Sequence, residues 1–202
     1  MFGEKMQKPY SQACENNKKA ILDVISPYFK ACSHILEIGS GTGQHAVFFA
    51  GHMPGLQWQT SDLLENHPGI VSWLSEAKLD NLHAPVELDV SSSEWLIDCV
   101  DGVFSANTAH IMAWSEVQAM FHRIGELLAS GGVFCLYGPF NYQGQYTSQS
   151  NAHFDQHLKQ RASHMGIRDF EAVTALAGSH GLILLADCEM PANNRTLIWQ
   201  KQ

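Results

Sequence analysis

Short apolar runs alternate along the chain with longer segments whose apolar residues recur every three or four positions. The runs that indicate strands are residues 34–39, 56–62, 84–90, 102–107, 132–138, 182–188 and 196–201. The segments that indicate helices are residues 11–29, 44–52, 69–78, 116–130 and 168–179. Alternation of this kind is typical of an α/β domain with a mostly parallel sheet and right-handed crossovers.

The end of the chain follows a different pattern. Only "EMPANNR" (189–195) joins the last two predicted strands, and this link is too short to hold a crossover helix. These strands should therefore pair antiparallel. We predict a Rossmann-like seven-stranded sheet with an antiparallel last strand and helices on both faces. One domain should span residues 1–202, with residues 1–30 as an N-terminal helical extension.

The longest stretch without a clear period is "GPFNYQGQYTSQSNAHFD" (138–155), which follows the fifth predicted strand. Long irregular loops in compact domains are usually functional or disordered. We expect a loop here that closes over a bound molecule as a lid.

Composition and charge restrict the class of protein. Hydrophobic residues make up 45% of the chain, enough for a substantial core, and the formal net charge is -8. From residue 31 to 122 the only lysine or arginine is Lys78, so a duplex nucleic-acid partner is not expected. Five cysteines without a C-x-x-C pair, and no apolar run long enough for a membrane, lead us to expect a cytoplasmic protein that binds no membrane. We expect no metal site, because the histidines of 153–164 lack a carboxylate partner at a defined spacing.

The stretch "LEIGSGTGQHA" (36–46) has glycines at every second position after a predicted strand. Ligands of open α/β sheets bind where the first strand ends, and glycines let the backbone approach them closely. A phosphate-binding P-loop would need a lysine, which is absent, and the dinucleotide pattern G-x-G-x-x-G/A fits only weakly, from Gly41 to Ala46.

Carboxylates at three predicted strand ends indicate the ligand. Glu37 precedes the glycines, where it would repel a pyrophosphate and suit a cationic group. Asp62 lies 19 residues after Gly43, where it would accept from ribose hydroxyls, and Asp89 would accept from the exocyclic amine of adenine. Three acids without a phosphate clamp favour a nucleoside joined to an amino acid, as in S-adenosylmethionine.

"LEIGSGTG", "SD" and "LDV" resemble the first three motifs of class I S-adenosylmethionine-dependent methyltransferases. The chain is further similar to the methyltransferase-like 26 family, through stretches that span nearly its full length. These are "ENNK" (15–18), "SGTGQHA" (40–46), "WQTSD" (58–62), "NTAHI" (107–111), "YGPF" (137–140), "SQSNAHFD" (148–155), "GIRD" (166–169) and "MPANN" (190–194). The chain departs from the family's E-R-N-K pattern at Asn16, where an arginine is expected.

The resemblance implies a set of site residues. Cofactor contacts are expected from the glycine loop, the strand ends and the N-terminal extension over the site, at Asn17, Lys18, Glu37, Gly39, Gly41, Gly43, His45, Asp62, Leu63, Asp89, Val90 and Asn107. Of these, Asn17 and Lys18 would fold over the cofactor and pair with its carboxylate. His110 and Tyr137 are the candidate catalytic groups, as base or hydrogen-bond donor. The candidate substrate contacts are Trp114, Phe140, Asn151 and Asp155.

These residues predict a methyltransferase that uses S-adenosylmethionine, releases S-adenosylhomocysteine and methylates a small molecule. "NTAH" (107–110) stands where the N/D-P-P-Y/F box of many amino-group methyltransferases is found, which disfavours DNA adenine as acceptor. Two alternatives remain open: a protein that binds S-adenosylmethionine without turnover and serves a partner, and an NAD-dependent oxidoreductase that uses the Gly41–Ala46 pattern.

Overall fold

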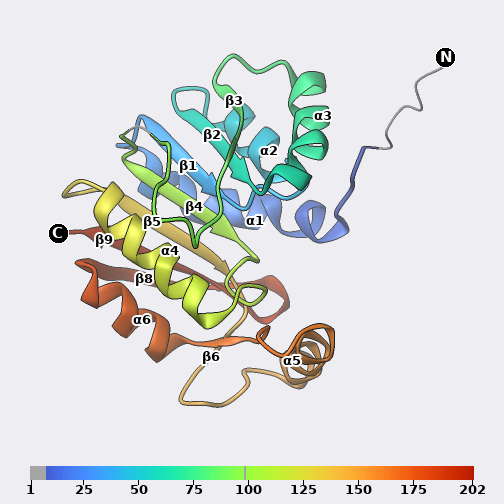
Figure 1. Ribbon diagram of the computed structural model, residues 1–202, viewed down its shortest axis with the longest axis vertical. Helices are drawn as coiled ribbons and strands as arrows, with labels where there is room; N and C mark the ends of the chain where they lie inside the picture. Colours follow the sequence, from blue (N-terminus) through green and yellow to red (C-terminus); the bar gives the residue numbers. More distant parts are fainter. Residues whose placement is uncertain (1–7, 98) are drawn as a thin grey trace.

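The computed structural model describes residues 8–97 and 99–202 (Figure 1). The helices are α1 (Gln12–Phe29), α2 (Gln44–His52), α3 (His67–Ala77), α4 (Trp114–Leu127), α5 (Gln149–Arg161) and α6 (Phe170–Ser179), with short 3-10 turns η1 (Leu64–Asn66) and η2 (Pro191–Asn193). The strands are β1 (His34–Ile38), β2 (Gln57–Asp62), β3 (Leu82–Glu87), β4 (Gly102–Ala106), β5 (Val133–Gly138), β6 (Phe140–Asn141), β7 (Arg168–Asp169), β8 (Leu182–Met190) and β9 (Asn194–Lys201).

Seven strands form one sheet in the order β3-β2-β1-β4-β5-β9-β8. Strands β1 to β5 pair parallel, while β9 runs antiparallel to both β5 and β8. The predicted fold class is therefore confirmed, including the reversed last strand. The order changes direction between β1 and β4, and ligands of such sheets bind beyond the strand ends at that switch point.

The two faces of the sheet are covered by different helices. Successive strand residues point to opposite faces, so Ile35 packs with α1 and α2 whereas Leu36 packs with α4 and α6. Figure 1 shows α4 and α6 side by side, and α2 and α3 together at the opposite end of the view. Side chains at alternate positions of each central strand thus pack into two separate cores, which fixes the strand register.

The expectation of an irregular loop over residues 138–155 is wrong in its second half. Helix α5 begins at Gln149, where the Ser148 hydroxyl caps it by accepting a 3.1 Å hydrogen bond from the Asn151 N–H. The helix has few apolar residues, and Leu158 is the only apolar one that is fully covered. It therefore lacks the stripe by which the other helices are recognised.

Helix α1 packs on the sheet through Ile21, Ile25 and Phe29, which have no exposed surface. The predicted extension over residues 1–30 includes residues 1–7, which lie outside the described part of the chain. Among the described residues, none of the helices has both the length and the apolar character needed to cross a lipid bilayer.

Candidate functional site

The loop between β1 and α2 contains three residues in the left-handed region. Gly39, Gly41 and Gly43 have φ of 72°, 57° and 86°. A Cβ on Gly39 would lie 2.6 Å from Cγ2 of Thr108, whereas a Cβ on Gly41 would meet nothing within 4 Å. Gly39 is therefore needed for close packing, and Gly41 leaves backbone open toward the space in front of the loop.

Four of the five N–H groups of residues 39–43 are committed to the protein. Gly39 and Ser40 donate to the Ser61 carbonyl at 3.1 and 2.9 Å, and Gly43 donates to the Ser40 carbonyl at 2.8 Å. Gly41 donates to Oδ2 of Asp62 at 2.7 Å. A phosphate-binding loop presents such N–H groups to its ligand, so this loop has a different use.

Asp62 at the end of β2 holds this arrangement together. Besides Gly41, its carboxylate accepts from the Leu63 N–H at 2.8 Å and from the Asn66 amide at 2.7 Å, both on Oδ1. A carboxylate has about four lone-pair sites. One acceptor position on Oδ2 is thus left for a further donor.

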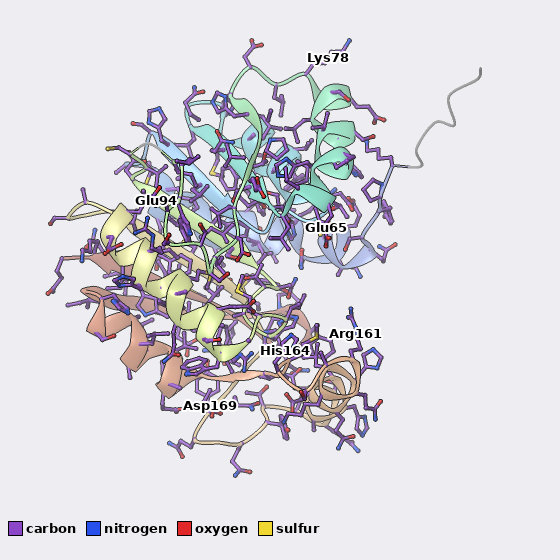
Figure 2. All side chains as sticks on the ribbon, in the orientation of Figure 1. Glu65, Lys78, Glu94, Arg161, His164 and Asp169 are labelled. Carbon is purple, nitrogen blue, oxygen red and sulfur yellow. The ribbon has the colours of Figure 1, made fainter. Side chains whose placement is uncertain are left out.

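A cavity of ≈ 490 Å³ opens in front of the loop, at the switch point between β1 and β4. We call it the acidic cavity, because Asp62, Glu65, Asp89 and Glu116 line it, and no lysine, arginine or histidine is among its lining residues in the described chain. Ile38, Gly39, Gly41, Leu63, Val90 and Asn107 also line it. Figure 2 labels Glu65 on the side of the molecule where α5 and Arg161 also lie.

Two of these acids differ in their environment. Asp89 is exposed, and the hydroxyl and N–H of Ser91 both donate to its Oδ1, which lowers the pKa of Asp89. Glu116 accepts from the Ala113 N–H and closes the start of α4. The lowered pKa keeps Asp89 ionised at neutral pH, so the cavity carries a negative potential.

Glu37 lies beneath the loop and does not line the acidic cavity. It is 2% exposed, and its Oε2 accepts from Ser40 Oγ at 3.0 Å and from Trp58 Nε1 at 3.1 Å. Burial raises the pKa of Glu37 to about 7. Its partners are two side chains of the protein, so the structure places Glu37 as a support of the loop.

A second cavity of ≈ 500 Å³ adjoins the first, and Asn107 lines both. Asn107 follows β4 with φ of 60°, a left-handed conformation that asparagine tolerates better than most residues. Its N–H donates to the Tyr137 carbonyl at 2.8 Å. Asn17, Tyr137 and Asn151, three of the predicted residues, line the second cavity with it.

The environment of Tyr137 and Asn17 is fixed by α1 and α2. Burial raises the pKa of Tyr137, and the side chains of Asn17 and Asn194 beside its hydroxyl oppose that rise. The Asn17 Oδ1 lies 2.7 Å from Nε2 of His45, whose pKa burial lowers to about 4. His45 is thus a neutral donor to Asn17, and it does not line either cavity in the described chain.

His110 is buried behind the second cavity. Its ring lies 5.2 Å from that of Phe154, edge to face, and Phe154 lines the cavity. Burial, with a smaller effect from Arg168, lowers the pKa of His110 to about 4. The imidazole is therefore neutral at pH 7 and a weak proton acceptor, one aromatic ring away from the cavity.

Besides Glu37, Gly43, His45 and His110, four further predicted residues lie outside the lining of both cavities. Lys18 pairs with Glu15 and lies 4.9 Å from the Phe48 ring centroid. Trp114 and Phe140 pack into the core under α4. Asp155 is 1% exposed and accepts from Tyr146, Lys159 and the Ile167 N–H, so it fixes α5 to its neighbours.

The sequence reasoning missed several residues of the acidic cavity. Glu65, Asn66, Thr108, Ile111, Met112 and Glu116 line it as well. Glu65 and Asn66 lie three and four residues after Asp62 and were open to the same strand-end argument. Glu116 lies at the start of a predicted helix, so only the position of α4 in space brings it to the cavity.

Residues 8–201 match the family described as "Protein of unknown function (DUF938)". In three dimensions the chain is similar to an O-methyltransferase family protein from Burkholderia thailandensis, with a TM-score of 0.82, 16% identity, and 92% of this chain and 56% of that one covered. Mitomycin 7-O-methyltransferase is similar with a TM-score of 0.83 and 15% identity, with 94% of this chain and 54% of that one covered. Human N-acetylserotonin methyltransferase in complex with S-adenosylmethionine is similar with a TM-score of 0.72 and 15% identity, with 91% of this chain and 54% of that one covered.

These likenesses show that the chain has the fold of the class I methyltransferases. The chain spans a little over half of the length of each of these solved structures.

Proposed function

We propose that this chain, which belongs to the family described as protein of unknown function (DUF938), is an S-adenosylmethionine-dependent methyltransferase. One observation carries the proposal. At the switch point of a methyltransferase-like sheet lies a cavity lined by four carboxylates and, among the described residues, by no basic side chain.

The charge of this cavity discriminates between nucleotide ligands. S-adenosylmethionine is a net cation, since its sulfonium and ammonium outweigh one carboxylate, and Asp62, Glu65, Asp89 and Glu116 would attract it. NAD carries a pyrophosphate, which these carboxylates would repel and which needs free loop N–H groups. The committed N–H groups of Gly39, Ser40 and Gly41 argue against the oxidoreductase alternative.

Individual residues of the acidic cavity fit parts of the nucleoside. The remaining acceptor position on Asp62 Oδ2 suits a ribose hydroxyl, because a hydroxyl donates to a carboxylate. Asp89 Oδ2, for which no partner is found within the described residues, suits an exocyclic amine. Val90 and Leu88 supply buried apolar surface next to it for a flat base.

The second cavity is the proposed site of the methyl acceptor. When bound, S-adenosylmethionine supplies a methyl carbon on a positively charged sulfur, open to in-line attack by an acceptor lone pair. Asn107 lines both cavities and so stands where the two bound molecules would meet. The protein's part is to orient the acceptor and exclude water, which accounts for much of the rate of such displacements.

Tyr137 would act as a hydrogen-bond partner of the acceptor and not as a base. The raised pKa keeps the Tyr137 hydroxyl protonated, so it orients the acceptor as a hydrogen-bond partner. His110 is neutral and lies behind Phe154, where it would take a proton only after movement of that ring. We propose Tyr137 as the nearer of the two to the reacting atoms.

We also propose that the likeness to the methyltransferase-like 26 family reflects shared ancestry and site. Five of its stretches converge on the second cavity: residues 15–18, 107–111, 137–140, 148–155 and 190–194 each contribute lining residues. Because these segments lie far apart in the sequence, their meeting at one cavity supports a common ligand for the family.

Thermal denaturation with ligands tests the function. A ligand that binds the folded state raises the melting temperature according to its concentration and affinity. S-adenosylmethionine and S-adenosylhomocysteine at millimolar concentration should each raise it, and NAD should not. A rise with NAD alone would refute the proposal and favour the oxidoreductase.

A further inference from the structure

The second cavity has an unusual lining. Six asparagines from different parts of the chain surround it: Asn16, Asn17, Asn107, Asn151, Asn193 and Asn194. They come from α1, the segment after β4, α5 and the turn between β8 and β9. We call this the amide cavity. No acidic or basic side chain is among its lining residues in the described chain.

The amides are oriented by contacts outside the cavity. Asn17 Oδ1 accepts a hydrogen bond from His45 Nε2, which leaves the Asn17 NH₂ group as a donor beside the Tyr137 hydroxyl. The Asn151 NH₂ group donates to Thr147 Oγ1 at 2.9 Å and to the Asn193 carbonyl at 3.0 Å. Its Oδ1 is therefore an acceptor. The cavity thus presents fixed donors and fixed acceptors on opposite segments.

Backbone strain is concentrated at the same place. Within the described residues five non-glycine residues have positive φ, and three of them, Asn107, Ala192 and Asn193, line the amide cavity. Such residues strain the backbone, persist only where their surroundings enforce them, and cluster at functional sites. Strain at three lining positions indicates that this geometry serves a ligand.

Part of the wall is apolar and flat. Pro139, Phe154 and Pro191 line the amide cavity together with the amides. An aromatic ring fits between such surfaces. A charged group, by contrast, would find no opposite charge among the lining residues of the described chain.

We propose that the amide cavity binds an uncharged methyl acceptor that joins a flat apolar ring to a group with both hydrogen-bond donor and acceptor atoms, such as a carboxamide. This inference rests on the proposed function for the transfer itself, and on the cavity alone for the ligand class. A carboxamide donates to Asn151 Oδ1 and accepts from the Asn17 NH₂ group, whereas a carboxylate loses the first contact and an ammonium the second.

Three probes of matched shape and different charge test the ligand class: benzamide, benzoate and benzylammonium. Their dissociation constants for the full chain are measured by NMR titration, with and without S-adenosylhomocysteine. Benzamide should bind at least about tenfold more tightly than either ion, because neither ion finds a counter-charge. Affinities of either ion within about threefold of benzamide, or no binding of benzamide, would overturn the proposal.

A variant locates the binding without changing the backbone. Asn193→Gly removes one amide at a residue with φ of 57°, which glycine adopts without strain. Gln143→Gly is the matched control, since Gln143 also has positive φ, of 51°, and lies outside the cavity lining. Asn193→Gly should weaken the binding of benzamide about threefold or more, because it removes a lining side chain whose NH₂ group holds Ser150 Oγ at 3.2 Å, and Gln143→Gly should not. Equal effects of both would contradict the assignment.

The same titrations separate the two proposals. If benzamide selectivity persists but S-adenosylhomocysteine fails to bind, the ligand class holds and the methyltransferase function fails. If S-adenosylhomocysteine binds and the three probes bind alike, the function holds and the ligand class fails.

Discussion

The carboxylate of Asp62 accepts a 2.7 Å hydrogen bond from the N–H of Gly41, which ties the end of β2 to the loop after β1. This bond uses the N–H group that a phosphate-binding loop would offer to its ligand. Asp62 lines the acidic cavity, and its Oδ2 keeps one acceptor position besides this bond. One contact therefore shapes the loop and occupies an N–H group that a phosphate would need.

The loop glycines should differ in their tolerance of alanine. Gly39→Ala places a Cβ 2.6 Å from Thr108 Cγ2 at φ of 72°, whereas Gly41→Ala meets only the cost of its left-handed φ. We expect Gly39→Ala to lower the free energy of unfolding by about 3 kcal/mol and Gly41→Ala by about 1–2 kcal/mol.

Urea denaturation measures both variants, and Thr108→Ser supplies the control. Serine removes Cγ2 but keeps the hydroxyl that bonds Ser105 at 2.7 Å. It should recover part of the loss in the Gly39→Ala background and none in the Gly41→Ala background. Equal recovery in both would show that the clash is not the cause.

A single lining charge should affect the cationic ligand selectively. Glu65→Gln removes one exposed carboxylate of the acidic cavity. Glu94→Gln removes an exposed carboxylate that does not line this cavity, and Figure 2 labels Glu94 apart from Glu65. Glu65→Gln should weaken the binding of S-adenosylmethionine about threefold at low salt, and by less at high salt. Fluorescence or calorimetric titration checks this, and an equal loss in Glu94→Gln would point to net charge instead of the cavity.

Glu37 should make stability depend on pH. Burial raises its pKa from the ordinary value of 4.5 to about 7 in the folded protein, so the folded state holds a proton that the unfolded state releases. Stability should therefore fall as pH rises from about 4.5 to about 7, by up to about 3 kcal/mol, and then level off.

Glu37→Gln isolates this effect because it removes the titrating group and keeps the side-chain shape. Wild type and variant should unfold alike near pH 4.5, and the variant should be the more stable above pH 7. Parallel pH profiles of the two melting temperatures would mean that Glu37 does not titrate in this range.

Asp155 should be a structural residue. It is buried and accepts from Tyr146 at 2.6 Å, from Lys159 at 2.6 Å and from the Ile167 N–H at 2.7 Å. Asp155→Ala leaves these donors without a partner and should cost about 3 kcal/mol of unfolding free energy. Asp80→Ala, at an exposed acid, should change it by less than about 0.5 kcal/mol, and a similar loss in both would refute the assignment.

Much of the fold follows from local patterns. The stripe of Val117, Met120, Phe121 and Ile124 predicts α4, and all four side chains are fully buried against the sheet. The short link before β9 predicts the antiparallel end for a steric reason that needs no tertiary information. Helix α5 was missed because caps and the polar anchor Asp155 hold it in place of an apolar stripe.

The lining of the acidic cavity was predictable where it follows strand ends and not where a helix contributes to it. Asp62, Asp89 and Asn107 each follow a strand, so parallel pairing alone gathers them. The sequence shows that Glu37 lies at a strand end but not which way its side chain turns. The prediction therefore could not show that this side chain turns toward Trp58. Trp114 and Phe140 are apolar residues next to a site, and only packing distinguishes a cavity wall from core.

The most direct test of the account is a calorimetric titration of S-adenosylmethionine into the wild-type chain and into Asp62→Ala, with NAD as the competing ligand. We predict micromolar binding of S-adenosylmethionine to wild type, a loss of at least about tenfold in Asp62→Ala, and no heat from NAD. Tighter binding of NAD than of S-adenosylmethionine, or unchanged S-adenosylmethionine affinity in a folded Asp62→Ala, would contradict the account.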